Sequence, residues 1–362
     1  MKVGGQPMRT LWPAPQRDAL MVIDQRALPH ALRIERLESA EAVEVAIREM
    51  WVRGAPLIGA TAAYGIALQM NRDAGDASLD AAAKWLARAR PTAVNLAWAL
   101  RRMTEALRPV AVADRARVAW DLADAIAEAD VETNAAIGRH GLALLQAIAQ
   151  RKPGAPVQVL THCNAGWLAT VDWGTATAPI YQAQAAGIDV HVWVDETRPR
   201  NQGASLTAWE LGQAGVAHTL IADNAGGHLM QRGEVDIVIV GCDRVSARGD
   251  VCNKIGTYLK ALAAQDNGVP FYVAMPISTL DPALDDGAAI PIEERGAREV
   301  THIAGVDAAG ALVEVRLTPE GTAAANPAFD VTPARFITGL ITERGLVNAE
   351  AGALRRLIEQ AP

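Results

Sequence analysis

DIVIVGCDR (residues 236–244) is the most apolar of five short runs that decide the fold. Each run is rich in β-branched residues and ends in polar residues or glycine, and longer stretches with helical patterning separate the runs. The other four are VQVLTH (157–162), DVHVWVDET (189–197), AHTLIAD (217–223) and PFYVAMP (270–276). This alternation is typical of βαβ units in a parallel sheet. We therefore predict a Rossmann-like α/β fold whose ligand crevice lies at the carboxyl ends of these strands.

The first 150 residues follow a different pattern. Strand-like runs on both sides of Leu28-Pro29-His30 predict a hairpin over 19–37, and Ser39 is expected to cap a helix that stops at Arg53-Gly54. Further helices are predicted at 79–89, 92–108 and 112–150. The rhythm changes at Lys152-Pro153-Gly154. We predict two domains: a mostly helical N-terminal domain with a small antiparallel sheet over 1–150, and a Rossmann-like catalytic domain over 151–362.

Composition excludes several classes of function. The 362 residues carry 34 Lys and Arg against 41 Asp and Glu, a net charge of −7, which argues against nucleic-acid binding as the main activity. Three cysteines without CxxC spacing make no disulfide framework. The N-terminus lacks the apolar core of a signal peptide, and two long uncharged stretches, 54–71 and 154–171, contain Gly, Pro and amides typical of protein interior. We expect a cytoplasmic enzyme that does not bind a membrane.

Familiar catalytic motifs are missing. The sequence has no GxGxxG after a strand, no GxxxxGK[ST], no GxSxG and no HExxH, which weakens dinucleotide, nucleotide, hydrolase-elbow and zinc-protease interpretations.

Two residues at predicted strand ends are candidates for catalysis. Cys163 lies in Thr161-His162-Cys163-Asn164-Ala165-Gly166, where a strand gives way to a turn near a helix start, and a helix N-terminus lowers a thiol's pKa. The alternative is a buried structural cysteine. Asp243 ends the most apolar strand, where desolvation raises a carboxyl pKa towards that of a general acid. The alternative is a structural ion pair with Arg244 or Arg248. Cys242 and Cys252 are interpreted as core cysteines.

Several polar residues indicate a site for an anionic small ligand. Asn253 and Lys254 are expected to open a helix, and an arginine precedes a predicted helix start at Arg53-Gly54-Ala55 and again at Arg90. Free backbone N–H groups and a cation at a helix start hold phosphate well. Gln202 adds a polar group after another predicted strand. A surface location is the ordinary alternative for a single lysine.

Together these motifs carry a specific resemblance. THCNAG, ETRPRNQGA, ADNAGGHLM, GCDRV, NKIGTY and NPAFDVTP follow RGAPLIG and RPTAVNL in this order. The chain closely resembles the methylthioribose-1-phosphate isomerases of methionine salvage over nearly its whole length. The wider family also holds ribose-1,5-bisphosphate isomerases and non-catalytic regulatory subunits of a translation-initiation exchange factor. Cys242 and Cys252 stand where the family more often has a small residue such as alanine.

The resemblance implies an aldose–ketose isomerisation of 5-methylthioribose 1-phosphate to 5-methylthioribulose 1-phosphate, without metal or nucleotide cofactor and in a homodimer. It implies that Cys163 and Asp243 are catalytic. It implies that the substrate is bound by Arg53, Gly54, Ala55, Arg90, Gln202, Asn253 and Lys254.

The reaction has one particular difficulty. A phosphate ester on the anomeric carbon prevents spontaneous ring opening, so the ring oxygen must be protonated before hydrogen moves from carbon 2 to carbon 1. We assign Asp243 as the proton donor and Cys163 to the reacting carbon, as base or transition-state stabiliser. Enediol and hydride-shift routes both satisfy this requirement. A ribose-1,5-bisphosphate isomerase would need a second anion site, and a regulatory subunit would be expected to lack the Cys and Asp pair.

Overall fold

The main sheet of the protein is seven-stranded, as seen in a computed structural model that describes residues 1–91 and 93–359. Its order is β18-β17-β12-β9-β6-β7-β8. All neighbours are parallel except β17 and β18. The strands are β6 (Val157–Thr161), β7 (Val190–Asp195), β8 (Ala217–Ile221), β9 (Ile237–Val240), β12 (Phe271–Ala274), β17 (Gly339–Thr342) and β18 (Gly345–Val347). All five predicted strands are present in it, so the predicted fold class is confirmed.

Both faces of this sheet are buried, which explains the unbroken apolar runs. Ile237 and Ile239 pack in one core cluster with α6 (Ala178–Ala185) and the second half of α5 (Val112–Arg151). Val238 and Val240 pack in a second cluster with α8 (Ala225–Gln231) and α9 (Thr257–Asp266). Successive side chains of a strand point to opposite faces, so a strand covered on both sides needs apolar residues at every position. Helix α7 (Ala208–Ala214) packs against β8.

The strand order predicts where the ligand crevice lies. The chain runs outward from β6 through β7 to β8, then returns to the other side of β6 with β9, β12 and β17. This is the Rossmann order, and its direction reverses between β6 and β9. Cys163 follows β6 and Asp243 follows β9. The two candidate catalytic residues therefore lie at the carboxyl ends of the two strands that flank the switch point.

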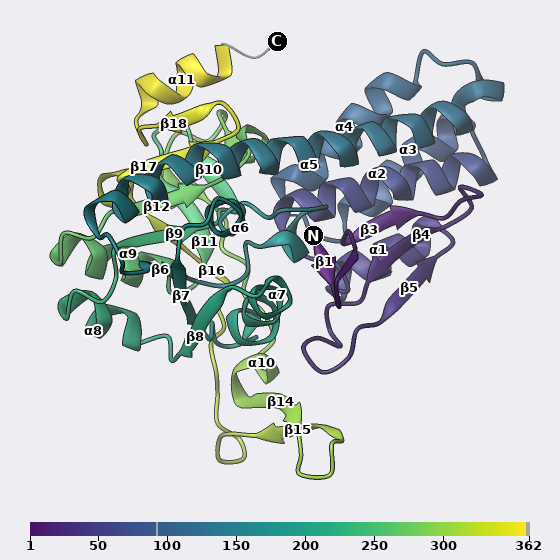
Figure 1. The fold of residues 1–362 in the computed structure, drawn as a ribbon. Coiled ribbons are helices and arrows are strands. Elements are labelled where there is room, and N and C mark those ends of the chain that lie inside the picture. Colours follow the sequence, from purple (N-terminus) through teal and green to yellow (C-terminus); the bar gives the residue numbers. More distant parts are fainter. Residues whose placement is uncertain (92, 360–362) are drawn as a thin grey trace.

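The N-terminal region packs four helices against a three-stranded antiparallel sheet (Figure 1). The predicted hairpin is confirmed, and Ser39 caps the following helix by accepting a hydrogen bond from the N–H of Ala42 at 3.2 Å. That helix ends at Arg48, earlier than predicted. The elements are β3 (Leu11–Pro13), β4 (Leu20–Ile23), β5 (Ile34–Leu37), α1 (Ala40–Arg48), α2 (Ala55–Arg72), α3 (Asp76–Ala87) and α4 (Val94–Leu107).

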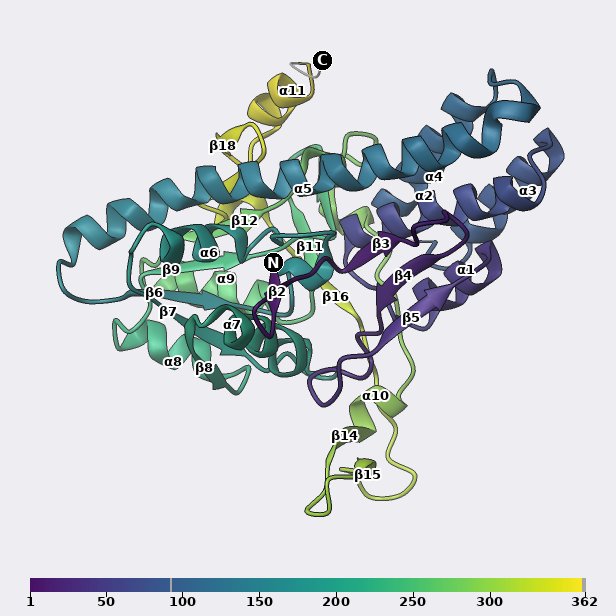
Figure 2. The same ribbon diagram turned by 45° about the vertical axis from the view of Figure 1, so that its right-hand side comes forward.

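Helix α5 joins the two regions. It packs against α2 at one end and against α6 and β17 at the other, and it runs the length of the molecule in both views (Figures 1 and 2). Because one helix belongs to both regions, the division into domains 1–150 and 151–362 stays a prediction.

A second sheet and a projecting arm were not predicted. The second sheet has the order β13-β10-β11-β16, and the arm is the antiparallel hairpin of β14 and β15, which projects from the body in both views (Figures 1 and 2). Most of these strands are short and lack an alternating pattern. The remaining elements are β1 (Lys2–Val3), β2 (Gln6–Pro7), β10 (Arg244–Ser246), β11 (Val251–Lys254), β13 (Leu280–Asp281), α10 (Arg298–Thr301), β14 (His302–Val306), β15 (Leu312–Arg316), β16 (Phe329–Thr332) and α11 (Ala351–Glu359). Within the described ranges, none of the helices combines the length and apolar character that a membrane span requires.

Candidate active site

One cavity opens at the switch point between β6 and β9. Its walls come from the N-terminal region, the sheet and the second sheet. All nine residues chosen from the sequence line it: Arg53, Gly54, Ala55, Arg90, Cys163, Gln202, Asp243, Asn253 and Lys254.

Cys163 is buried at the end of β6, with its backbone in the left-handed region at φ 64°. Its N–H donates to Thr197 Oγ1 at 2.7 Å, and its Sγ lies 3.5 Å from Gln202 Oε1. The expected helix start is wrong, because the next α-helix begins at Ala178. Burial raises the pKa of the Cys163 thiol, while Lys254 and Arg53 oppose that rise. The thiol is therefore protonated in the free protein.

Asp243 is half-buried at the end of β9, where its backbone N–H donates to Cys252 O at 3.0 Å. Among residues 1–91 and 93–359, no ion pair holds its carboxylate. Burial raises the pKa of Asp243, opposed by Lys254, Arg90 and Arg53. The alternative, an ion pair of Asp243 with Arg244 or Arg248, is not formed: Arg248 pairs with Asp285 at 2.5 Å, and Arg244, which also lines the cavity, lies 3.6 Å from Asp281.

Lys254 faces both candidate catalytic residues. It is buried, its Nζ donates to Ala328 O at 3.0 Å, and burial lowers its pKa while Cys163 and Asp243 oppose that change. The expected helix start is wrong here too: Asn253 and Lys254 are the last residues of β11, and α9 begins at Thr257. Pairing with β16 fixes this strand. Asn253 Nδ2 donates to Thr257 Oγ1 at 3.0 Å.

The turn at residues 53–55 combines a cation with a true helix start. Helix α2 begins at Ala55, directly after Gly54. Gly54 has φ 100°, and a side chain there would put its Cβ 2.4 Å from Ala169 O, so only glycine fits. The guanidinium of Arg53 is buried and already occupied: Nε donates to Gln25 Oε1 at 3.1 Å, and both Nη atoms bond Asn164. Arg53 therefore also fixes the loop after Cys163.

Two further charged residues were missed by sequence reasoning. Arg295 lines the cavity but is held by Glu299 at 2.8 Å, much as Arg90 is held by Glu293 at 3.1 Å. Glu210 is buried beneath the loop after Cys163. Its carboxylate accepts hydrogen bonds from Asn164 Nδ2 at 3.0 Å and Leu168 N at 2.8 Å. Burial raises the pKa of Glu210 to about 7. Neither residue lies in a recognisable motif, and only the fold brings them to the site.

Cys242 and Cys252 both line the same cavity. Cys252 is buried, and Cys242 is half-buried and packs against the core cluster on one side of the sheet. Burial raises the pKa of both thiols, and the neighbouring Asp243 carboxylate raises it further.

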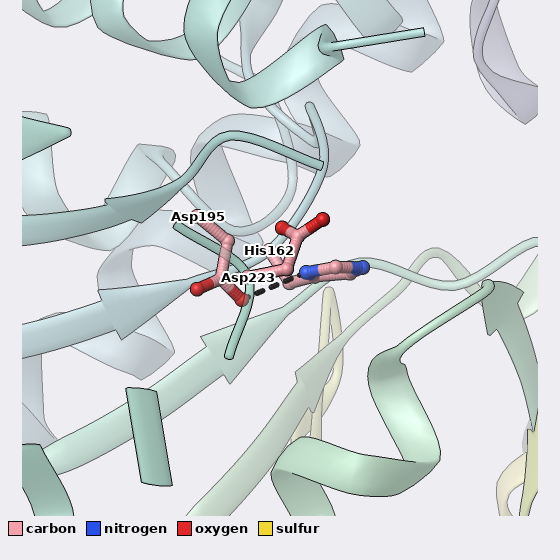
Figure 3. A group of neighbouring side chains, drawn as sticks. All are labelled: His162, Asp195 and Asp223. Carbon is pink, nitrogen blue, oxygen red and sulfur yellow. Dashed lines mark hydrogen bonds and ion pairs between the residues drawn. The ribbon is translucent and has the colours of Figure 1, made fainter. Parts of the chain in front are cut away.

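A group of possible metal ligands includes His162, which lines the cavity. Ligand atoms of His162, Asp195 and Asp223 lie within 4.8 Å of one another, although their spacing in the sequence gives no metal motif. Figure 3 shows the hydrogen bond between His162 Nδ1 and Asp195 Oδ2, which are 2.8 Å apart. The Lys260 ammonium lies 3.1 Å from the same Asp195 oxygen, and the Asp223 carboxylate accepts from the backbone N–H of Thr197 and Arg198 at 2.7 and 2.8 Å. The donor set therefore fits a salt-bridge network better than a metal.

Exhaustive chelation is expected to leave kcat unchanged. Lys260 supplies the positive charge that a metal would bring to Asp195. Turnover measured before and after dialysis against a chelator tests this. Loss of activity that zinc or magnesium restores would contradict it.

The chain is similar to known proteins over nearly its whole length. Residues 51–349 match the initiation factor 2 subunit family. The chain is 60% identical to a methylthioribose-1-phosphate isomerase of Cereibacter sphaeroides, covering 100% of this chain and 99% of that protein.

Two solved structures resemble the whole fold. A crystal structure of 5-methylthioribose 1-phosphate isomerase from Pyrococcus horikoshii has a TM-score of 0.84 at 39% identity, covering 98% of this chain and 97% of that one. The translation initiation factor eIF-2B, subunit delta, from A. fulgidus has a TM-score of 0.78 at 38% identity, covering 94% of this chain and 96% of that one.

Proposed function

The chain belongs to the initiation factor 2 subunit family, and on that premise we propose that it is the aldose–ketose isomerase of methionine salvage that converts 5-methylthioribose 1-phosphate to 5-methylthioribulose 1-phosphate. One observation carries the proposal. Nine residues spread from position 53 to position 254, chosen for this chemistry, surround a single cavity at the switch point of a Rossmann-type sheet.

Asp243 protonates the ring oxygen. The substrate's anomeric carbon carries a phosphate ester, so the ring opens only with acid assistance at its oxygen. A carboxyl group whose pKa is raised by burial, with no ion pair to any described residue, holds its proton to higher pH than an ordinary aspartate and is suited to donate it.

Cys163 stabilises the charge that develops at the reacting carbons. Its thiol is protonated in the free site because burial raises its pKa. Lys254 and Arg53 act on the same thiol and oppose this rise. A buried hydrogen-bond donor that is already fixed in place needs little reorganisation when charge develops during the reaction. This favours the stabiliser role over that of a resting thiolate base.

The start of α2 and the nearby cations bind the phosphate. Pro56 has no N–H, but Ala55 presents its backbone N–H at the first turn of an 18-residue helix, beside Gly54. Lys254 and Arg90 line the same cavity, with Asn253 and Gln202 as further polar groups.

Lys254→Ala is expected to weaken substrate binding about 10- to 100-fold, because a charge-assisted hydrogen bond is lost in a buried site. The effect should shrink for an analogue without the phosphate. Lys84→Ala, the same change at an exposed position of α3, serves as the control. Equal losses for phosphorylated and unphosphorylated ligands would refute the phosphate role.

Turnover of the purified protein on 5-methylthioribose 1-phosphate and ribose 1,5-bisphosphate, measured side by side, tests the function. We expect the methylthio substrate to be strongly preferred, because the other cavity arginines lie beside carboxylates: Arg295 pairs with Glu299 at 2.8 Å, and Arg244 lies 3.6 Å from Asp281. Faster turnover of the bisphosphate would change the substrate assignment. Inactivity on both would favour a regulatory subunit, the class to which the A. fulgidus likeness points.

We also propose a cytoplasmic homodimer. The exposed apolar residues of the arm, such as Leu312 and Val315, are the kind of surface that a partner covers. Analytical ultracentrifugation measures the mass, and a monomer at all concentrations would exclude the dimer.

A further inference from the structure

Glu210 is a fully buried side chain beneath the loop that follows Cys163. Hydrogen-bond donors face both of its carboxylate oxygens: Asn164 Nδ2 at 3.0 Å and Leu168 N at 2.8 Å on Oε1, and Trp167 N at 3.1 Å and the Tyr181 hydroxyl at 3.2 Å on Oε2. A buried donor that loses its acceptor is costly, because water cannot replace the lost partner. The carboxylate therefore holds the loop 164–168 in one conformation.

The loop approaches Glu210 more closely than a side chain would allow. A Cβ on Gly166 would lie 1.6 Å from Glu210 Oε2, so any larger residue would push the carboxylate out of its hydrogen bonds. The φ of Gly166 is −89°, which any residue can adopt. Close approach, rather than backbone conformation, is thus the reason for glycine at this position.

Asn164 connects Glu210 to the cavity. The guanidinium of Arg53 donates to both Asn164 O and Asn164 Oδ1. Because a guanidinium can only donate, Oδ1 must face Arg53, and this turns Nδ2 towards Glu210. Arg53 and Asn164 line the cavity, whereas Glu210 lies outside its lining. Glu210 therefore acts on the cavity through Asn164.

The helical segment that carries Glu210 also contacts Cys163 directly. A π-helical turn, Gly203–Thr207, leads into α7, and such turns are frequent at functional sites. Thr207 Oγ1 donates to the carbonyl oxygen of Cys163 at 2.6 Å. Gln202 directly precedes the turn, and its Oε1 lies 3.5 Å from Cys163 Sγ. One segment thus contacts the backbone and the sulfur of Cys163 and supports the loop that follows it.

We propose that Glu210 is a positioning residue that fixes the loop after Cys163 and, through Asn164, aims the guanidinium of Arg53 at the substrate. Glu210 itself does not touch the substrate, because it lies outside the cavity lining. The effect on turnover rests on the proposed isomerase function, whereas the effect on the loop does not. The loop is therefore tested on the free protein.

The rate at which Cys163 is alkylated measures how firmly the loop is held. Peptide mass spectrometry after iodoacetamide treatment separates labelling at Cys163 from labelling at Cys252, a buried cysteine of β11 that reports global unfolding. In Glu210→Gln an amide N–H₂ replaces one acceptor and faces the donors of the loop. We expect the ratio of the Cys163 rate to the Cys252 rate to rise about tenfold, because local opening becomes easier. An unchanged or lower ratio would overturn the proposal, whatever the activity.

Kinetics of two matched variants separate positioning from stability. Glu210→Gln is expected to lose about 10- to 100-fold in kcat/KM, because both Arg53 and the loop after Cys163 are displaced. Tyr181→Phe removes a donor to the same carboxylate but no hydrogen bond of the loop. We expect both variants to lower the melting temperature and Tyr181→Phe to keep most of its activity. Equal losses of kcat/KM in the two variants would refute the positioning role.

Asn164→Ala tests the same link from its other end and serves also if Glu210→Gln does not fold. It keeps the bonds from Trp167 N and Leu168 N to the carboxylate and removes the amide between Glu210 and Arg53. We expect a loss of about 10- to 100-fold in kcat/KM, and no further loss in the double variant. Near-normal kcat/KM in Asn164→Ala would contradict the proposal. A wild-type protein that is inactive on every sugar phosphate refutes the proposed function, and the alkylation test still decides this inference.

Discussion

Asp243→Asn is expected to lower kcat by about 10³-fold while folding and substrate binding are retained, because general acid catalysis contributes about 10²- to 10⁴-fold. Asparagine keeps the shape of the side chain but has no proton to deliver to the ring oxygen. No described residue forms an ion pair with this carboxylate, so the change breaks no salt bridge. Steady-state kinetics together with a thermal melt measure both parts of the expectation.

The matched control lies at the other end of the same strand. Asp236 directly precedes β9 and pairs with Lys152 at 2.7 Å, far from the crevice. Asp236→Asn is expected to lower the melting temperature but to keep kcat. A fully active Asp243→Asn enzyme would remove Asp243 from the mechanism. Equal losses of kcat in both variants would mean that the effect comes from folding.

The same role predicts a loss of activity as the pH rises. A proton donor acts only when protonated, and that fraction falls as the pH passes upward through its pKa, so Asp243 sets the alkaline limb of the kcat/KM profile. Lys254 is the strongest of the cations that oppose the rise in the pKa of Asp243. Lys254→Met should therefore raise this pKa further and move the limb to higher pH. A limb that moves to lower pH or stays in place would contradict the assignment.

Cys163→Ser is the second variant with a large expected effect, a fall in kcat of about 10²-fold with KM nearly unchanged, because the proton offered to the developing charge is then held by a much weaker acid. The alcohol is a far weaker acid than the thiol, and its shorter bond to carbon withdraws the donor from the reacting carbons. The backbone is held independently of the sulfur by the 2.7 Å bond from Cys163 N to Thr197 Oγ1, so the loop should keep its shape.

Cys242→Ser makes the same thiol-to-alcohol change in the same cavity. We expect it to cost less than about tenfold in kcat, because no step is assigned to that sulfur. A Cys163→Ser enzyme with near-normal kcat would exclude a catalytic Cys163. Equal losses in both variants would point to the polarity of the cavity rather than to one thiol.

Local pattern was enough to predict five strands of the main sheet, the N-terminal hairpin and most helices of the N-terminal region. A strand buried on both faces must be apolar at every position, and Ile237 to Val240 satisfy this in sequence as they do in space. Ser39 was recognisable as a cap because its oxygen serves an N–H only three residues away. The short strands of the second sheet carry no such local signal, since they are defined by partners such as β11 with β16.

The sequence by itself selected the candidate residues for the chemistry, because the motifs around Cys163, Asp243 and Lys254 identify a family. Only the tertiary structure decided which groups surround these residues, and therefore their pKa values and hydrogen-bond partners. It placed β6 beside β9. Burial raises the pKa of Cys163, where a helix start was expected to lower it. The Arg53 guanidinium donates a hydrogen bond to Asn164. The tertiary structure also closed His162 between Asp195 and Ile255, residues 33 and 93 positions away. Periodicity reports burial over a few neighbouring residues, whereas pKa and hydrogen bonding depend on groups that only the folded chain brings together.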